Sequence, residues 1–292
     1  MAQRMTMSVA ETDESGWNFE SRDSSLEADS LFERPIRAIF VSDLHLGCRY
    51  ANAAALRSFL KGKKPEYLYL VGDILDGWKL KRGFYWNDSY SFLVRRIIGL
   101  LKHGTIIRYC PGNHDEFLRD FLYHFGTVEI ADEFIHHTAD GRRALVLHGD
   151  QFDTVVRHHR WLTLLGDIGY DVLLVVNRIF NAIRKRCGCG YWSLSAYIKR
   201  QVKRATSFIS NFEDVVTRYA DSKNCDAVIC GHIHTPKLST VNGVSYCNTG
   251  DWVESCTALV EYADGSFELI HHSSDSVDGA EESELMLEEA AA

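Results

Sequence analysis

Short apolar runs, each ended by a polar residue, glycine or proline, set the pattern in the first part of this chain. Three of them have the length and the β-branched or aromatic content of buried strands, namely Ile36–Ser42, Tyr67–Val71 and Thr105–Cys110. Between these runs, Asn52–Leu60 and Tyr90–Lys102 repeat their apolar residues with helical spacing. Strands that alternate with helices predict a mostly parallel sheet with crossover helices.

The pattern changes later in the chain, where three hairpins are predicted. Asp140-Gly141, Asn242-Gly243 and Asp264-Gly265 each separate two β-rich runs, and such pairs are preferred in two-residue hairpin turns. A further buried strand, Ala227–Cys230, precedes the second hairpin. We expect these segments to form a second layer of mainly antiparallel strands.

Residues 155–206 form a predicted helical insertion with ten Lys or Arg and two acids. The apolar run Trp161–Phe180 is interrupted by charged residues such as Asp167 and Asp171. Each charge costs about 2.5–3.5 kcal/mol at the centre of a bilayer, which disfavours a spanning helix. Two interpretations remain. The insertion could be a lid with an apolar face and a basic rim that can touch a membrane surface, or a helical subdomain that buries its own core.

Both ends of the chain are predicted to be disordered acidic tails. Residues 1–34 hold eight acids and three bases, and residues 274–292 hold seven acids and no base. The net charge of −8 therefore leaves about +4 on the domain 35–273, which suits an anionic substrate. The N-terminal tail lacks the apolar core of a signal peptide, and the eight cysteines form no C-x-x-C pair. We expect a cytoplasmic protein.

Residues of metal-binding type follow the predicted strands. Ligands of open α/β folds bind at the carboxyl ends of the strands, so these side chains should meet at one edge. Asp43 and His45 are two residues apart and face the same side, and Asp73 can bridge two cations through its two oxygens. The candidate ligands are Asp43, His45, Asp73, Asn113, His148, His232 and His234.

Seven ligands exceed the needs of one ion and match two ions that share Asp73. A histidine-rich set with few carboxylates favours divalent transition-metal ions, with Mn²⁺ as the first choice and Fe or Zn²⁺ as the others. Two such ions ~3.5–4 Å apart can clamp a phosphoryl group for in-line attack. The chain is therefore predicted to hydrolyse a phosphate compound.

Other residues are candidates for catalysis or substrate binding. His114 follows Asn113 and can give or take a proton near neutral pH. His136 and His137 face opposite sides of a strand, so we interpret them as structural. Positive and aromatic side chains that could hold a flat, anionic substrate are Trp78, Lys79, Arg82, Lys199, Lys203 and Arg204. The first three could instead pack a loop.

The ordered motifs of the chain resemble those of the calcineurin-like metallophosphoesterase superfamily. They are D-x-H at Asp43, G-D-x-x-D at Gly72, G-N-H-D at Gly112, H-G-D at His148 and G-H-x-H at Gly231. The resemblance extends from about Ile36 to His272 and implies an α/β fold, a four-layer α/β/β/α sandwich. It implies one metal on Asp43, His45, Asp73 and His234, and another on Asp73, Asn113, His148 and His232. His114 would stabilise charge or protonate the leaving group, and Asp115 would hold its imidazole.

Within the superfamily, the chain is similar to the UDP-2,3-diacylglucosamine diphosphatase branch. The similarity rests on Ser42–Gly47, Tyr69–Asp73 and the long insertion between His148 and Gly231. It implies a lid over sugar and acyl chains, a lipid A precursor cleaved at its pyrophosphate, and peripheral contact with the inner membrane. Enzymes of this branch usually have Arg where this chain has His114.

Three functions remain open. The first is hydrolysis of a nucleotide-sugar lipid, and the second is hydrolysis of another phosphate compound, such as a phospholipid headgroup, a nucleotide or a nucleic acid end. A metal-bound scaffold without catalysis ranks last, because every expected ligand and His114 are present. The basic residues of the insertion accompany an apolar run rather than spaced stacking aromatics, which favours a lipid over nucleic acid. The sequence does not define an oligomeric state.

Overall fold

The computed structural model describes residues 11–12, 18–23, 34–83, 85–121, 127–155, 209 and 211–272. The chain divides into two compact units, one made of Met1–Gln151 and Val216–Ala292 and the other of Phe152–Val215. Most of the predicted insertion, with Lys199, Lys203 and Arg204, lies outside the described residues and stays a prediction, as does the C-terminal tail. Among the described residues, every helix is too short or too polar to span a bilayer.

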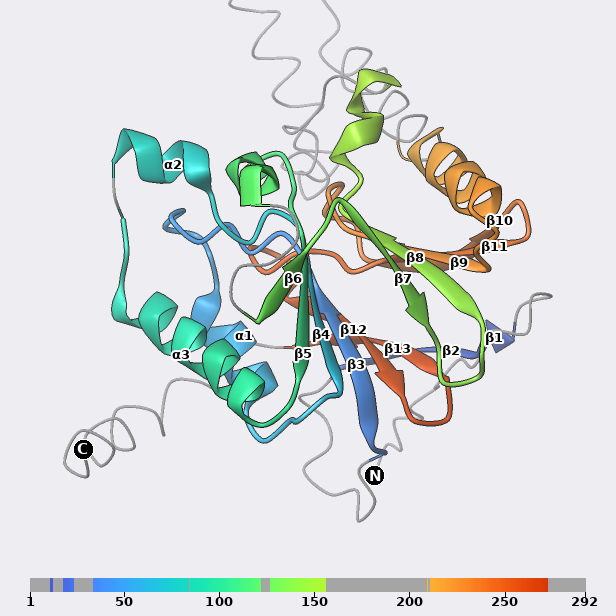
Figure 1. The fold of residues 1–292 in the computed structure, drawn as a ribbon, viewed down its shortest axis with the longest axis horizontal. Coiled ribbons are helices and arrows are strands. Elements are labelled where there is room, and N and C mark those ends of the chain that lie inside the picture. The colour runs from blue at the N-terminus through green and yellow to red at the C-terminus, as the bar shows by residue number, and fades with distance from the viewer. Residues whose placement is uncertain are drawn as a thin grey trace, which may run out of the picture. The chain divides into compact units, whose positions relative to one another are not determined.

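The larger unit contains a sheet of eight strands, in which β3, β4 and β5 are mutually parallel as predicted and β6 adds a further parallel strand. The strands in spatial order are β1 (Glu11–Thr12), β2 (Asn18–Asp23), β13 (Phe267–His271), β12 (Thr257–Tyr262), β3 (Ile36–Val41), β4 (Tyr67–Val71), β5 (Ile106–Cys110) and β6 (Val128–Ile130). The helices α1 (Ala53–Leu60) and α3 (Asp88–Lys102) connect β3 to β4 and β4 to β5 (Figure 1).

Both helices begin at an asparagine and cover one face of this sheet. Asn52 accepts a hydrogen bond from the Ala55 amide, and Asn87 accepts one from the Tyr90 amide, which caps the free amides of each first turn. The apolar faces of α1 and α3 are buried with alternate strand residues in one core, including Leu56, Phe59, Leu93, Leu100, Ile39, Leu68 and Ile107.

A second sheet of five strands faces the first (Figure 1). Its order is β10 (Lys237–Val241), β11 (Val244–Asn248), β9 (Ala227–Cys230), β8 (Arg143–Leu147) and β7 (Glu133–His137). A separate core fills the space between the sheets, with Phe40, Tyr69, Val146, Ile229 and Leu259 among its members. The part of a helix that belongs to this unit, residues 216–222, supplies the fourth layer, and Tyr219 and the following Lys223 contact Glu133 on β7. The predicted four-layer α/β/β/α sandwich is confirmed.

The three hairpins form, but the expectation of a mainly antiparallel second layer is wrong. β7 with β8 and β10 with β11 are antiparallel, whereas β9 runs parallel to both of its neighbours. The third hairpin, β12 with β13, extends the first sheet by pairing with β3. A turn sequence determines that its own two strands pair with each other. Which sheet the hairpin then joins depends on the sheet edge that is available in the fold.

The prediction of a fully disordered N-terminal tail also needs correction. β2 pairs in parallel with β13, and β1 pairs with β2, so both continue the first sheet. Backbone pairing supplies this order in a segment whose side chains show no apolar periodicity. In the described ranges, the remaining elements are α2 (Gly77–Arg82) and the 3-10 helices η2 (Glu116–Phe121) and η3 (Asp150–Val155).

Candidate metal centre and active site

The candidate ligands occupy turns at the carboxyl ends of the strands. The turn after β3 is bonded to the turn after β4, since the Asp43 amide donates to Gly72 O at 3.0 Å and the His45 amide donates to Asp73 O at 2.8 Å. Five of the seven candidates have positive φ, with values of 53° at Asp43, 56° at His45, 53° at Asp73, 69° at His232 and 51° at His234. This conformation costs about 1–3 kcal/mol per residue, and such strain is concentrated at functional sites.

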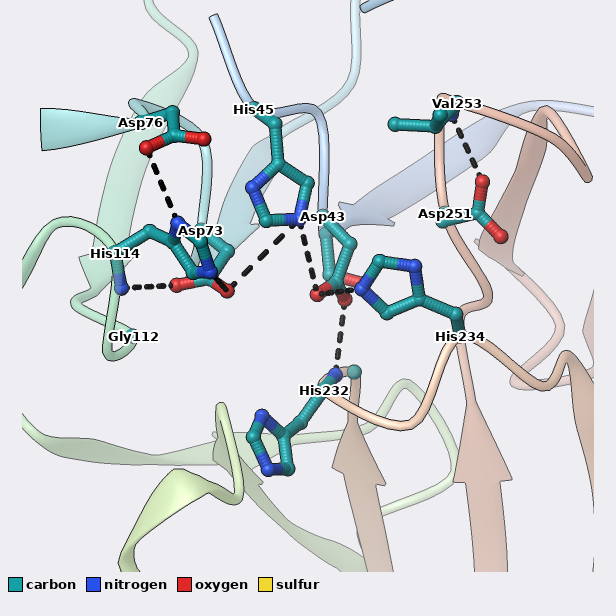
Figure 2. A network of polar contacts seen from close by, with 12 residues as sticks. Asp43, His45, Asp73, Asp76, Gly112, His114, His232, His234, Asp251 and Val253 are labelled. Atoms are coloured by element: carbon teal, nitrogen blue, oxygen red, sulfur yellow. Dashed lines mark hydrogen bonds and ion pairs between the residues drawn. The ribbon is translucent and has the colours of Figure 1, made fainter. Parts of the chain in front are cut away.

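Asp73 lies at the middle of the site. Its Oδ2 atom is 3.6 Å from His148 Nε2 and 3.9 Å from the Nε2 atoms of both His45 and His114. On the other side of His45, Asp43 Oδ1 lies 3.0 Å from His234 Nε2 (Figure 2). Within the described part of the chain, three overlapping groups of potential ligands result, and Asp43, His45 and Asp73 each belong to two of them.

His232 and Asn113 are near this centre but take different positions. The His232 amide donates to Asp43 Oδ2 at 2.9 Å, while its ring points away from Asp43 (Figure 2). That ring lies 5.0 Å from the ring of His148, measured between centroids. Asn113 belongs to the turn after β5, and its Oδ1 is buried. The ring of His232 therefore lies toward the His148 side of the site.

The donor atoms fit divalent metal ions. Buried polar atoms normally make hydrogen bonds, yet His45 Nε2, Asp73 Oδ2, Asn113 Oδ1 and His148 Nε2 make none among the described residues. The Nδ1 atom of His148 donates to the carbonyl of Val71 at 2.9 Å, an arrangement that turns Nε2 toward Asp73 and is typical of metal-binding histidines. Nitrogen and carboxylate donors of this kind suit transition-metal ions.

The charges of the site also favour a cation. Burial would raise the pKa of Asp43, but His234 and the other nearby histidines hold it well below its usual range. Burial likewise opposes ionisation of Asp73, while His148 lowers the pKa of Asp73 to about 2. Burial disfavours the charged form of His148, but Asp73 outweighs it and raises the pKa of His148 to about 10. Both aspartates are thus ionised, and their field attracts positive charge.

Glycine at two positions lets the backbone approach the aspartates. A Cβ atom on Gly112 would lie 2.4 Å from Asp73 Oδ1, and one on Gly231 would lie 2.4 Å from Asp43 Oδ2. A side chain at either position would displace a candidate ligand, which explains the glycine of the G-N-H-D and G-H-x-H motifs in physical terms.

His114 lies at one end of the site and is held on several sides. Its amide donates to Asp73 Oδ1 at 2.7 Å, and its Nδ1 lies 3.2 Å from Asp76 Oδ1 (Figure 2). The ring of Trp78 is 4.3 Å from the His114 ring, and the ring of His45 is 4.6 Å away at nearly a right angle. His114 thereby directs Nε2 toward Asp73.

The prediction that Asp115 holds the His114 imidazole is wrong. The Asp115 carboxylate accepts hydrogen bonds from the amides of Gly112 and Ile74 at 2.6 and 2.8 Å and from the Tyr109 hydroxyl. It therefore ties the turn after β5 to the turn after β4. The residue beside His114 Nδ1 is Asp76, whose Oδ1 also accepts from the Lys79 amide and caps α2. Asp76 is the second aspartate of the G-D-x-x-D motif, so the sequence does point to this residue. The spacing of the motif alone, however, does not give the direction of its side chain.

The other predicted substrate-binding residues that the structure describes lie on α2. Trp78 is 45% exposed although it contacts His114, whereas Lys79 and Arg82 are exposed farther along the helix. Of the nearby aromatics, Trp86 donates to Ser91 Oγ and packs on the core around α3, so it acts as a loop-packing residue. His136 is buried and bonded to Tyr69 and Glu261, which agrees with the structural role predicted for it.

Several known proteins are similar to this chain. The model of the calcineurin-like phosphoesterase family matches residues 36–236. The chain is 26% identical over 250 residues to UDP-2,3-diacylglucosamine hydrolase from Aliivibrio fischeri, covering 79% of this chain and 96% of that protein. It is 25% identical over 249 residues to the protein of the same name from Vibrio atlanticus, covering 80% and 96%. Among solved structures, vacuolar protein sorting 29 from Cryptosporidium parvum aligns with a TM-score of 0.40 and 11% identity, over 81% of this chain and 96% of that chain.

Proposed function

The chain belongs to the calcineurin-like phosphoesterase family, and from that premise we propose that it is a two-metal hydrolase of a UDP-2,3-diacylglucosamine-like compound. Family membership makes it a metal-dependent hydrolase of phosphoric esters, as the sequence predicts. The observation that supports two metals best is the central position of Asp73, whose Oδ2 lies within 4 Å of three imidazole nitrogens.

In this proposal the ligands divide into two sets around Asp73. One ion is held by Asp43, His45, Asp73 and His234, and the other by Asp73, Asn113, His148 and His232. Mn²⁺ is the proposed ion, with Fe and Zn²⁺ as the alternatives. When bound, such a pair supplies an activated water and positive charge for the phosphoryl oxygens.

The remaining residues of the site act on orientation and proton transfer. His114 is proposed to stabilise the charge that develops on a phosphate leaving group, or to protonate the leaving group where that group is an alcohol. Asp76 holds the Nδ1 side of the ring, which leaves Nε2 to face the reacting group. Asp115 maintains the distance between the Asp73 and His114 turns through its hydrogen bonds to the backbone.

The proposed substrate rests on the hydrolases of UDP-2,3-diacylglucosamine that the chain resembles over nearly their full length. The predicted insertion is both apolar and basic. It would suit a substrate with an anionic end and an apolar end whose acyl chains lie in a membrane. Each acyl methylene buried by the insertion would contribute up to about 0.8 kcal/mol, so even a few would matter for recognition. Peripheral contact with a membrane surface is part of this proposal.

The test is incubation of the Mn²⁺-loaded chain with UDP-2,3-diacylglucosamine and with its deacylated form. Hydrolysis of the pyrophosphate bond releases UMP and a sugar 1-phosphate whichever phosphorus is attacked, and both products can be measured by mass spectrometry. The acylated compound should be preferred. Replacement of residues 155–206 by a short linker should abolish this preference and spare small aryl phosphodiesters. Equal rates on both compounds with the intact chain would contradict the lipid substrate.

A second candidate is a phosphodiesterase with an alcohol leaving group. The observation that favours it is His114 beside Asp76, because an alkoxide needs a proton when it leaves and a phosphate group does not. Glycerophosphodiesters and aryl phosphodiesters are suitable probes. Faster cleavage of a glycerophosphodiester than of the acylated UDP-sugar would select this candidate.

A further inference from the structure

A cavity of about 390 Å³ opens beside His114, between α2 and η2. Its walls include Trp78, Lys81, His114, Glu116, Phe117 and Asp120. His114 forms part of both this cavity and the metal centre, because its Nε2 lies 3.9 Å from Asp73 Oδ2. A substrate whose phosphate is at the centre could therefore extend into the cavity without leaving the protein surface.

One wall of the cavity is a stacking surface. The Trp78 ring lies 4.3 Å from the His114 ring, and the side chain remains 45% exposed. An indole held in this way offers a flat apolar face to a second ring. Stacking of a base on an aromatic side chain contributes about 1–3 kcal/mol, which corresponds to about 5- to 150-fold in affinity.

The charges of the cavity favour a nucleoside over an acyl chain. Lys81, Glu116 and Asp120 are exposed at its wall, and burying charges under hydrocarbon is strongly unfavourable. Carboxylates accept hydrogen bonds from ribose hydroxyls in nucleotide sites, and an ammonium group can pair with a phosphate. Arg119 also borders the cavity, but its charge is taken up by Asp132 and Asp150, each at 2.9 Å.

We propose that this cavity is the subsite for the nucleoside end of the substrate, with the base stacked on Trp78. The inference rests on the proposed function and deepens it, since a nucleotide-linked pyrophosphate has one polar aromatic end and one acylated end. Trp78 stacks on the base, Lys81 faces the phosphate-ribose part, and the acylated end extends away from α2.

The experiment measures the binding of UMP and of ribose 5-phosphate to the full chain loaded with Mn²⁺, by calorimetry. The two probes share the phosphate and the ribose and differ in the base. UMP should bind about 5- to 150-fold more tightly. Trp78→Ala should remove this difference and leave the binding of ribose 5-phosphate within about twofold, whereas Trp78→Phe should keep most of it. Tyr50→Ala, which removes another exposed aromatic ring, should change neither affinity.

Three results would overturn the subsite. They are equal affinities of the two probes for the native chain, an advantage of UMP that survives in Trp78→Ala, or an equal loss of both affinities in that variant. The hydrolysis assay separates this outcome from the substrate assignment. A base-dependent affinity without cleavage of the acylated UDP-sugar refutes the substrate and keeps the subsite, and cleavage without base-dependent affinity does the reverse.

Discussion

Two buried polar clusters in the larger unit contain similar residues but differ in how their atoms are paired. Near the amino end of β3, the Glu261 carboxylate contacts Arg37 at 3.0 Å and His136 at 2.7 Å and accepts from the Ala139 amide. The ring of His136 is also bonded to the Tyr69 hydroxyl at 2.9 Å. At the carboxyl ends of the strands, by contrast, atoms of His45, Asp73, Asn113 and His148 make no hydrogen bond among the described residues.

The difference separates a structural role from a functional one. A fully paired buried network stabilises one arrangement of the two sheets, and nothing further is needed to satisfy it. A convergent set of buried polar atoms without hydrogen bonds destabilises the folded protein on its own. The set becomes favourable only when these atoms bind a partner that the chain itself does not supply. Residue types such as Asp and His therefore do not indicate function until their partners are known.

The largest expected effect is that of Asp73→Asn in the unpaired cluster. The native chain should hold about two Mn²⁺ ions by elemental analysis, and the variant should lose metal from both sites, because Asp73 is the shared ligand. Activity should fall by more than about 10⁴-fold, beyond the range of a lost proton donor. His45→Ala, as a comparison, should empty mainly one site. Full metal content in Asp73→Asn would exclude a bridging role.

The next effect is that of His114→Ala on turnover. Metal content should be unchanged, and turnover of a substrate with a poor leaving group should fall by about 10²- to 10⁴-fold. The loss should be smaller with a p-nitrophenyl phosphodiester, whose leaving group needs no proton. Steady-state kinetics on the two substrates measures this difference. Equal losses would assign His114 to charge stabilisation or to the geometry of the metals.

Glu261→Gln tests the paired cluster and should act on stability alone. Breaking a buried ion pair costs about 3–5 kcal/mol, and the lower value is expected because Arg37 also contacts Glu66. At about 2–4 °C per kcal/mol, the melting temperature should fall by about 6–12 °C. Metal content and activity at low temperature should be retained. Glu129→Gln is the control, since its pair with Arg108 is half-exposed and is worth under about 1 kcal/mol.

The smallest effect is expected for Tyr109→Phe. The Tyr109 hydroxyl donates to Asp115, which holds the turns of Asp73 and His114. Loss of this hydrogen bond should destabilise the chain by about 1–3 kcal/mol and reduce activity modestly through displaced turns. Chemical denaturation and a rate measurement on the same sample test both effects. A large loss of activity with native stability would mean that Tyr109 contacts the substrate instead.

The sequence predicts well the strands that precede the candidate ligands and the positions of these residues at the strand ends, for a physical reason. Buried strands have the pattern of short apolar runs, and the polar residue after each run must lie at the sheet edge, so the sequence alone indicates the positions of Asp43, Asp73 and His148. The direction of a side chain and the identity of its partners cannot be predicted in this way. Nothing local distinguishes Asp76, which contacts His114, from Asp115, which turns back to the backbone. The same limit applies to β12 and β13, whose docking on the first sheet depends on distant segments.

The left-handed backbone at the ligand positions has a consequence for how the protein could be improved. Asp43, His45, Asp73, His232 and His234 have the conformation that glycine and asparagine tolerate best. Selection for thermal resistance alone would favour replacement of the three histidines by glycine, because glycine adopts a positive φ without this strain. Variants recovered in such a selection should be enriched at these positions and inactive. A selection for stability in this chain therefore needs a simultaneous screen for activity. Without that screen, the recovered variants will have lost the residues of the site.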